Sequence, residues 1–210
     1  MSQLPLAPKV VSVMLAAGGS RRFDGTKLAA KLGHKTHAQS IIQHTFSTLT
    51  EATTQLDIAP PVVVLGGHKN RLMPLLPKDT LVLENNDWST GLASSVAMAA
   101  YYAHSQHADA MLLTLADQVA ISYLHYLSLY RIYCQFGKTT AAYYQQSFGV
   151  PAIFLAKDFK ALQQLKGDSG AKKILKQHSN NQQLVVFPLE QAAIDIDTKA
   201  DLSLWLANKE

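Results

Sequence analysis

A glycine-rich loop follows the first apolar run of the chain and is the clearest candidate for a binding site. It covers residues 16–27 and reads AAGGSRRFDGTK. Small residues let a ligand approach the backbone and expose its N–H groups, while Arg22 and Lys27 add fixed positive charge. We therefore expect this first loop to bind an anion such as a phosphate. The alternative is a solvated turn in which the two basic residues bind nothing.

The spacing of the first loop differs from that of the two best-known phosphate loops. A Walker loop ends in Gly-Lys followed by Ser or Thr, whereas this loop ends in Gly-Thr-Lys. The dinucleotide fingerprint G-x-G-x-x-G is also missing, because Gly18 and Gly19 are adjacent. Both a P-loop and an NAD-binding function are therefore disfavoured.

Aspartates in two later segments are suited to hold a cation. Asp117 follows the apolar run 110–115, so it would stand at the carboxyl end of a buried strand. Protein-bound Mg²⁺ is usually held by one or two carboxylates together with phosphate oxygens of a substrate. Asp195 and Asp197 are separated by one isoleucine, which would place both carboxylates on one face of a short strand. Helix capping is sufficient to explain Asp197 and Asp201.

A polar segment over residues 85–96 opens a predicted helix. Its sequence, NNDWSTGLASSV, offers hydroxyls and free backbone donors at a helix start. These groups suit a phosphate or the edge of a nucleotide base. The alternative is a capped helix in which Trp88 only contributes packing.

The histidines and the cysteine predict no further site. His34 with His37, and His104 with His107, have a spacing that could hold zinc on a helix. Neither pair has a third ligand nearby, so we interpret both as solvated pairs. Cys134 is the single cysteine, which excludes an intrachain disulfide. Its apolar surroundings in the sequence predict an inert core thiol.

Short apolar runs of strand length alternate with longer helical patterns along the chain. The predicted strands cover residues 10–15, 61–65, 80–83, 110–115, 140–144 and 184–187. The predicted helices cover residues 38–49, 92–104, 121–136, 159–165, 170–178 and 198–206. This order predicts an α/β fold with a single doubly wound, mostly parallel sheet and helices on both faces. In such a sheet ligands bind outside the carboxyl ends of the strands, where the first loop and Asp117 would lie.

The composition is typical of a soluble globular protein. The 210 residues are 48% hydrophobic and 16% charged, and no internal repeat or linker divides them. We expect one domain over residues 1–210, with a core of about residues 9–206. The net charge of +4 is small and its positive residues are scattered, which favours a small anionic ligand over nucleic acid. The chain lacks an apolar run of about 18 residues, so we expect a cytoplasmic protein without a membrane partner.

Several segments resemble the motifs of the MobA-like nucleotidyltransferases. Residues 15–27 resemble the family signature L-A-A-G-x-S-x-R-M-G-x-x-K, with Asp24 where the family has glycine. Asn85, Trp88, Gly91, Ser95 and Val96 match N-x-x-W-x-x-G-M-x-x-S-[LIV].

The distal segments resemble the family less closely. Residues 115–119 resemble L-x-D-Q-P with Val119 at the proline, and residues 194–202 resemble D-I-D-T-P-E-D-L. Val150 stands at a histidine position of the family and Lys172 at an arginine position. Within the superfamily, the double alanine of the first loop is similar to the molybdenum cofactor cytidylyltransferase branch.

The resemblance implies a Rossmann-like nucleotidyltransferase fold and a Mg²⁺-dependent reaction. The enzyme would transfer NMP, in the first instance CMP from CTP, to a phosphorylated acceptor and release pyrophosphate. It implies molybdopterin as the acceptor and a transient contact with a molybdoenzyme or its chaperone. Two alternatives remain open: another acceptor such as a sugar phosphate, which Val150 and Lys172 favour, or a non-catalytic chaperone that binds a nucleotide or cofactor.

The resemblance also assigns roles to residues. Arg22, Lys27 and Asp117 would be catalytic, and Asp117 and Asp195 would hold the metal. The nucleotide would contact Leu15, Ala16, Ala17, Gly18, Gly19, Ser20, Asn85, Gly91 and Ser95.

Overall fold

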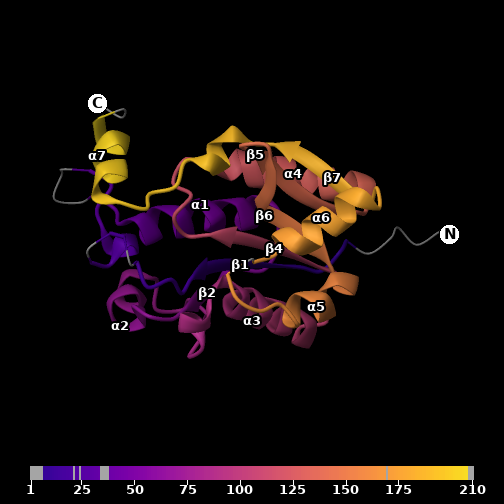
Figure 1. The fold of residues 1–210 in the computed structure, drawn as a ribbon, viewed down its shortest axis with the longest axis horizontal. Helices are drawn as coiled ribbons and strands as arrows, with labels where there is room; N and C mark the ends of the chain where they lie inside the picture. Colours follow the sequence, from indigo (N-terminus) through magenta and orange to yellow (C-terminus); the bar gives the residue numbers. More distant parts are fainter. Residues whose placement is uncertain (1–6, 21, 24, 34–37, 169, 208–210) are drawn as a thin grey trace.

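The computed structural model describes residues 7–20, 22–23, 25–33, 38–168 and 170–207. Its strands are β1 (Val10–Ala16), β2 (Val62–Leu65), β3 (Val82–Glu84), β4 (Ala110–Leu115), β5 (Thr139–Tyr144), β6 (Ser147–Leu155) and β7 (Leu184–Pro188). They form one seven-stranded sheet in the order β3-β2-β1-β4-β6-β5-β7 (Figure 1). All neighbouring strands are parallel except the pairs that β6 makes with β4 and β5. The predicted doubly wound, mostly parallel sheet is confirmed.

The helices alternate with the strands along most of the chain. They are α1 (Ile41–Gln55), α2 (Lys69–Leu72), α3 (Leu92–Ser105), α4 (Tyr123–Phe136), α5 (Ala156–Gln163), α6 (Lys172–Asn180) and α7 (Lys199–Ala207). Short 3-10 turns η1 (Lys27–Ala29), η2 (Met73–Leu75), η3 (Trp88–Thr90) and η4 (Glu190–Ala193) complete the elements. The start of α1 is fixed by Ser40, whose hydroxyl accepts from the Gln43 N–H while the Gln43 side chain accepts from the Ser40 N–H.

Every predicted strand and helix forms, and the bounds agree within three residues except at the end of α1, which continues six residues past its predicted end at residue 49. The structure adds β6 and α2. The sequence of β6 contains Gly149 and Pro151, which interrupt the apolar pattern expected of a strand interior. The helix α2 is only four residues long and therefore has too little periodicity to be recognised.

The central strands β1, β2 and β4 are buried on both faces, which explains their continuous apolar runs. Met14 of β1 belongs to the core under α1 and α4, whereas its neighbour Val13 belongs to the core under α3, α5 and α6. Figure 1 shows α1 above the central strand and α3 below it. Successive side chains of a strand point to opposite faces, so a strand covered on both sides must be apolar throughout.

The strand order reverses between β1 and β4. From β1 the chain builds β2 and β3 on one side, then returns to place β4 on the other. A crevice forms at such a reversal, outside the carboxyl ends of the two strands. The topology therefore brings the first loop, which follows β1, next to Asp117, which follows β4.

The prediction of a core thiol was wrong, because Cys134 is exposed. On α4 the buried positions include Tyr126, Leu129 and Tyr133, which lie three or four residues apart and face the sheet. Cys134 follows Tyr133 by one residue and is rotated away from that face.

The structure describes only one of the two histidine pairs. His34 and His37 lie outside the described residues. His104 and His107 are exposed at the end of α3.

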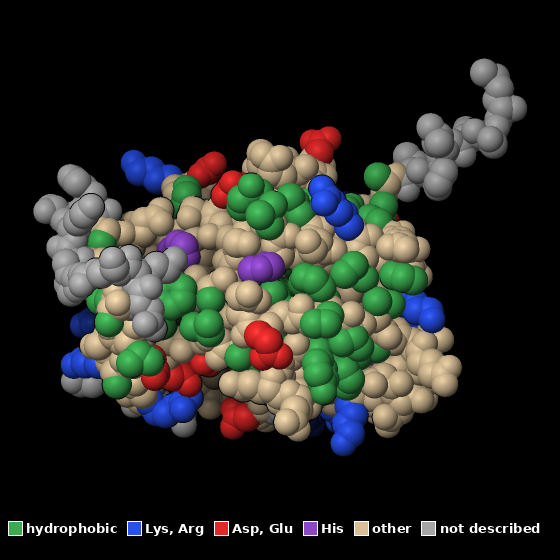
Figure 2. All heavy atoms as spheres, turned by 90° about the horizontal axis from the view of Figure 1, so that it is seen from above, with side chains coloured by type: hydrophobic (Ala, Val, Ile, Leu, Met, Phe, Trp, Pro, Cys, Tyr) green, Lys and Arg blue, Asp and Glu red, His purple; other side chains and the backbone are tan. Residues whose placement is uncertain are grey.

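The face of the molecule seen in Figure 2 carries its charges in a dispersed pattern. On the face shown in Figure 2, most basic side chains lie singly among acidic and apolar ones. Among the residues that the structure describes, no helix combines the length and apolarity that crossing a bilayer would require.

Candidate active site

A pocket of about 440 Å³ opens at the carboxyl ends of β1 and β4. The lining comes from the first loop, the start of α3, the acids that follow β4 and η4, and Asp168 of the distal loop. From the predicted site, the lining includes Leu15, Ala16, Ala17, Gly18, Gly19, Ser20, Arg22, Lys27, Gly91, Ser95 and Asp117. The structure thus brings most of the predicted residues together in one pocket.

Hydrogen bonds within the first loop, and between it and the loop that follows β2, fix its conformation. The Lys27 N–H donates to Ser20 Oγ over 3.2 Å, which closes the loop on itself. The Gly67 N–H donates to the Ala17 carbonyl (3.2 Å), and His68 Nε2 lies 3.1 Å from the Gly19 carbonyl oxygen. His68 was not predicted, because its contact joins residues 49 positions apart and has no local signal.

Trp88 packs between the first loop and the turn that follows β2. A Cβ atom added at Gly66 would lie 2.6 Å from the Trp88 Cβ and 2.8 Å from the Ala17 carbonyl oxygen. Glycine at position 66 is therefore required by the close approach of these two segments. Trp88 does contribute packing, and in doing so it also forms a wall of the pocket.

We expect Gly66→Ala to destabilise the protein by about 2 kcal/mol, because a methyl group there must push apart well-packed groups. For a chain of this size, the melting temperature should fall by about 4–8 °C, which differential scanning fluorimetry can measure. Gly18→Ala is the matched control, since an added Cβ there meets nothing within 4 Å. Equal melting temperatures for the two variants would contradict this account of the turn.

Asn85 lies beneath the start of α3 and does not line this pocket. It is 2% exposed, and its Nδ2 donates to Ser94 Oγ and Ser95 Oγ over 2.9 Å each. Its Oδ1 accepts from the Asp87 N–H (2.9 Å). The amide of Asn85 therefore fixes the positions of the Ser94 and Ser95 hydroxyls at the start of α3. Of these three residues, only Ser95 also lines the pocket.

Gly91 allows the distal loop to reach the pocket. Its φ of 116° is strained for other residues, and an added Cβ would lie 2.5 Å from the Gly167 carbonyl oxygen. That carbonyl accepts a hydrogen bond from the Ala93 N–H (3.0 Å). The contact places Asp168 at the pocket wall, while Ser169 lies outside the described residues.

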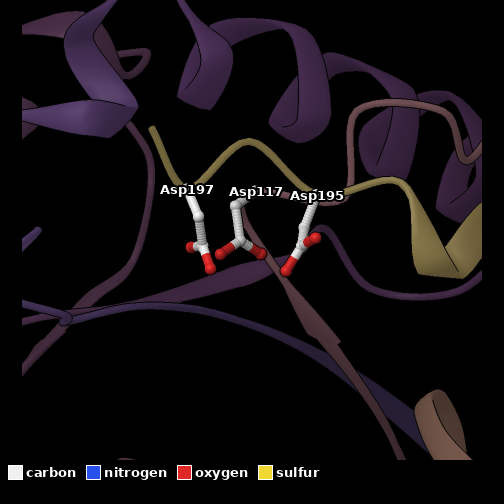
Figure 3. Close-up of side chains that lie close together, drawn as sticks. All are labelled: Asp117, Asp195 and Asp197. Atoms are coloured by element: carbon white, nitrogen blue, oxygen red, sulfur yellow. The ribbon is translucent and has the colours of Figure 1, made fainter. Parts of the chain in front are cut away.

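Asp117, Asp195 and Asp197 form an acid cluster, of which Asp117 and Asp197 line the pocket. One carboxylate oxygen from each lies within 4.8 Å of the others. Figure 3 shows the three side chains pointing in the same direction, Asp117 from the turn after β4 and the other two from the loop before α7. The Oδ1 atom of Asp117 is buried and makes no hydrogen bond.

The interpretation of Asp197 as only a helix cap was wrong. The start of α7 is capped by Thr198 and Asp201: Asp201 Oδ2 accepts from the Thr198 N–H (2.7 Å), and Thr198 Oγ1 accepts from the Asp201 N–H (3.2 Å). Asp197 instead turns toward Asp117. The alternation of Asp195 and Asp197 was the available signal, and both do face one way, although the backbone there is irregular and not a strand.

Two cations of the first loop pair with the acid cluster. Lys27 Nζ lies 2.7 Å from Asp117 Oδ2 and 2.8 Å from Asp197 Oδ1, and Arg22 pairs with Asp197 Oδ2. Burial would lower the pKa of Lys27, but its ion pairs with both aspartates outweigh burial and raise that pKa above its ordinary value. Lys27 is therefore a permanent positive charge in this pocket.

Asp195 differs from Asp117 and Asp197 in that neither cation pairs with it. It forms no ion pair within the described part of the chain. Partial desolvation raises the pKa of its carboxyl group, and repulsion from Asp117 and Asp197 raises it further. A cation bound to the cluster would relieve this repulsion.

A second pocket of about 400 Å³ adjoins the first and shares Leu15, Leu92, Leu115 and Asp168 with it. Asp195, Tyr144 and Gln118 line the second pocket. Val150 and Lys172 line it too, so two of the departures from the family motifs gather here. Of the other two, Val119 is buried after β4 and Asp24 lies outside the described residues.

Gln118 joins the walls of the second pocket. Its Nε2 donates to the carbonyl oxygens of Val150 in β6 and Ala192 in η4, over 2.9 Å each. These bonds tie the segment that carries Asp195 to the sheet. Gln118 was not predicted as a site residue, although it directly follows Asp117.

Together these groups can bind an anion and a divalent cation side by side. Backbone N–H groups with Arg22 and Lys27 suit phosphate oxygens, and three converging carboxylates suit a hard cation. The adjoining pocket can hold a second molecule next to both.

One family model and one bacterial relative match most of this chain. The family model described as MobA-like NTP transferase domain matches residues 12–182. The purine catabolism protein PucB of Bacillus subtilis (strain 168) is 28% identical over 178 residues, which cover 81% of this chain and 82% of that protein.

Two solved structures share the fold. Rv0371c from Mycobacterium tuberculosis H37Rv superimposes with a TM-score of 0.74 at 21% identity and covers 96% of this chain and 98% of its own. The same protein has also been solved in complex with manganese. A nucleotidyl transferase from Methanothermobacter thermautotroptrophicus, Mth528, has a TM-score of 0.73 at 18% identity, with 95% and 99% coverage.

Proposed function

Since this chain belongs to the MobA-like nucleotidyltransferases, we propose that it transfers CMP from CTP to a phosphorylated acceptor and releases pyrophosphate. Molybdopterin is the acceptor that we propose first. The observation that carries this proposal is the juxtaposition, in one pocket, of the first loop and its two cations with Asp117 and Asp197 of the acid cluster.

In the proposed reaction an acceptor phosphate oxygen attacks the α-phosphorus of CTP in line with the leaving group. A new P–O bond forms, the bond from the α-phosphorus to the bridging oxygen of the β-phosphate breaks, and that oxygen leaves as part of pyrophosphate. The attacking oxygen is already anionic, so no general base is required. Catalysis then depends on positioning and charge stabilisation.

The first loop would supply this stabilisation to the leaving group. Its backbone N–H groups with Arg22 and Lys27 would bind the β- and γ-phosphates, on which negative charge increases as pyrophosphate departs. Ser95 and Gly91 at the start of α3 would lie against the rest of the nucleotide.

The acid cluster fits a divalent metal, for which we propose Mg²⁺. Asp117 Oδ1 is a buried acceptor without a hydrogen bond, and Asp195 and Asp197 bring further oxygens within 4.8 Å. When bound, the metal would neutralise charge on the phosphate oxygens between the two substrates. Asp117 and Asp195 are the ligands that we propose, with Asp197 as a third.

We place the acceptor in the second pocket, which borders the acid cluster through Asp195. Lys172 provides one positive charge there for an acceptor phosphate. A lysine binds phosphate as a point charge and lacks the bidentate geometry of arginine, and Val150 offers no polar group. These two residues favour a second candidate function, in which a sugar phosphate replaces molybdopterin as the acceptor.

A pyrophosphate-release screen that crosses CTP, GTP, ATP and UTP with molybdopterin and a panel of sugar phosphates tests these assignments. We expect the fastest release with CTP and molybdopterin, and its loss when EDTA removes the divalent metal. A faster reaction with GTP or ATP would overturn the base assignment, and one with a sugar phosphate would overturn the acceptor. Nucleotide binding without turnover on any acceptor would favour a non-catalytic binding protein.

A further inference from the structure

In the structure, the two cations proposed to bind the triphosphate, Arg22 and Lys27, form ion pairs with acids of the proposed metal site. Lys27 Nζ bridges Asp117 and Asp197 at 2.7 and 2.8 Å, and Arg22 pairs with the other oxygen of Asp197. Asp197 is thus the one residue in the described cluster that binds both cations. All four side chains line the same pocket.

These pairs are held with different strength. The Lys27 side chain is 12% exposed, whereas that of Arg22 is 73% exposed. An exposed pair is weakly held and exchanges readily, while Lys27 has two of its three N–H donors directed at carboxylates. A triphosphate that draws both cations toward itself therefore competes with Asp197 for Arg22 and Lys27, and with Asp117 for Lys27.

We propose that Asp197 is a positioning residue that holds Arg22 and Lys27 on the acid cluster until nucleotide and metal bind together. This inference rests on the proposed function. When the triphosphate takes the two cations, Asp117 and Asp197 lose their partners and become free to bind the metal. When the metal takes the carboxylates, the cations are released toward the phosphates. Each ligand therefore raises the affinity for the other.

Asp195 provides a matched control for Asp197. Both aspartates belong to the same cluster, but Asp195 forms no ion pair with a described residue. Asp197→Asn and Asp195→Asn each remove one negative charge from the same cluster, but only Asp197→Asn also removes ion pairs with Arg22 and Lys27. A difference between the two variants therefore reports the release of the cations.

The first experiment measures CTP binding by isothermal titration calorimetry in EDTA, without metal. We expect Asp197→Asn to bind metal-free CTP about tenfold more tightly than Asp195→Asn, which corresponds to one ion pair no longer competing with the phosphates. Equal affinities for the two variants would overturn the inference.

The second experiment needs no nucleotide and no change at an aspartate. Mn²⁺ alone is titrated into wild type and Lys27→Met, and free Mn²⁺ is followed by electron paramagnetic resonance. We expect Lys27→Met to bind Mn²⁺ about tenfold more tightly than wild type, because the competing ammonium is gone. Lys31→Met is the control for loss of one positive charge, since Lys31 is exposed and makes no ion pair among the described residues.

An unchanged or weaker Mn²⁺ affinity in Lys27→Met, or the same gain in Lys31→Met, would overturn the inference. The outcome is separable from the proposed function. In one outcome, the wild type binds CTP with Mg²⁺ and releases pyrophosphate while the variants show none of the expected changes in CTP or Mn²⁺ affinity. In that case only the role of Asp197 fails. If the wild type binds no nucleotide under any condition, the proposed function fails and this role fails with it.

Discussion

Asp117→Asn is expected to lower the rate of pyrophosphate release about a thousandfold, the range found when a charge-stabilising group is removed from a transition state. The substitution keeps the shape of the side chain but removes its charge. It weakens the contact with Lys27 and replaces the buried, unpaired Oδ1 with a poorer metal ligand. A coupled pyrophosphate assay with saturating CTP, Mg²⁺ and acceptor measures the effect.

Thermal unfolding of Asp117→Asn should stay close to that of the wild type, which separates chemistry from folding. Asp57→Asn is the matched control, because Asp57 is an exposed aspartate in the turn after α1 and an asparagine also accepts its left-handed backbone (φ 53°). Activity of Asp117→Asn within tenfold of the control would contradict the assigned role of Asp117.

The largest effect on stability is expected at Asp158, far from the pocket. This side chain is 6% exposed and joins three elements. Its Oδ2 accepts from Thr139 Oγ1 at the start of β5 (2.7 Å) and from the Leu155 N–H at the end of β6 (3.3 Å). Its Oδ1 lies 2.8 Å from His178 Nε2 of α6.

Asp158→Ala leaves these buried donors without a partner, so we expect it to lower the free energy of unfolding by about 3–4 kcal/mol. The melting temperature should then fall by about 10 °C. Urea denaturation followed by circular dichroism measures the free energy directly. Asp79→Ala, at an exposed aspartate before β3, should change it little. A loss below about 1 kcal/mol at Asp158 would show that the three elements do not depend on this carboxylate.

Much of the candidate site was predictable because its signals are local. The first loop and Asp117 each follow directly on an apolar strand, and parallel strands gather their carboxyl ends at one edge of a sheet. The basic residues of the loop were visible in its composition, and the family motif assigned the roles to Arg22 and Lys27. The predicted strands were reliable for the same reason, since a strand buried on both faces must be apolar along its length.

Other parts of the site could not be predicted because they depend on distant contacts. His68 reaches the first loop across 49 positions, and Lys27 reaches Asp197 across 170. Gln118 connects β6 to η4, and β6 itself escaped prediction because Gly149 and Pro151 break its pattern. A local pattern carries no information about which side chain will fill the space opposite it.

By itself, the sequence determined the α/β order, the burial of the strands and the position of the first loop, because periodicity and turn residues act over a few positions. Only the tertiary structure decided how the charges pair. It placed Asp197 between Arg22 and Lys27 where capping had seemed a sufficient explanation, and it separated two adjoining pockets. Ion pairs depend on distances of a few ångströms between segments far apart in the chain, and only the packed fold sets those distances.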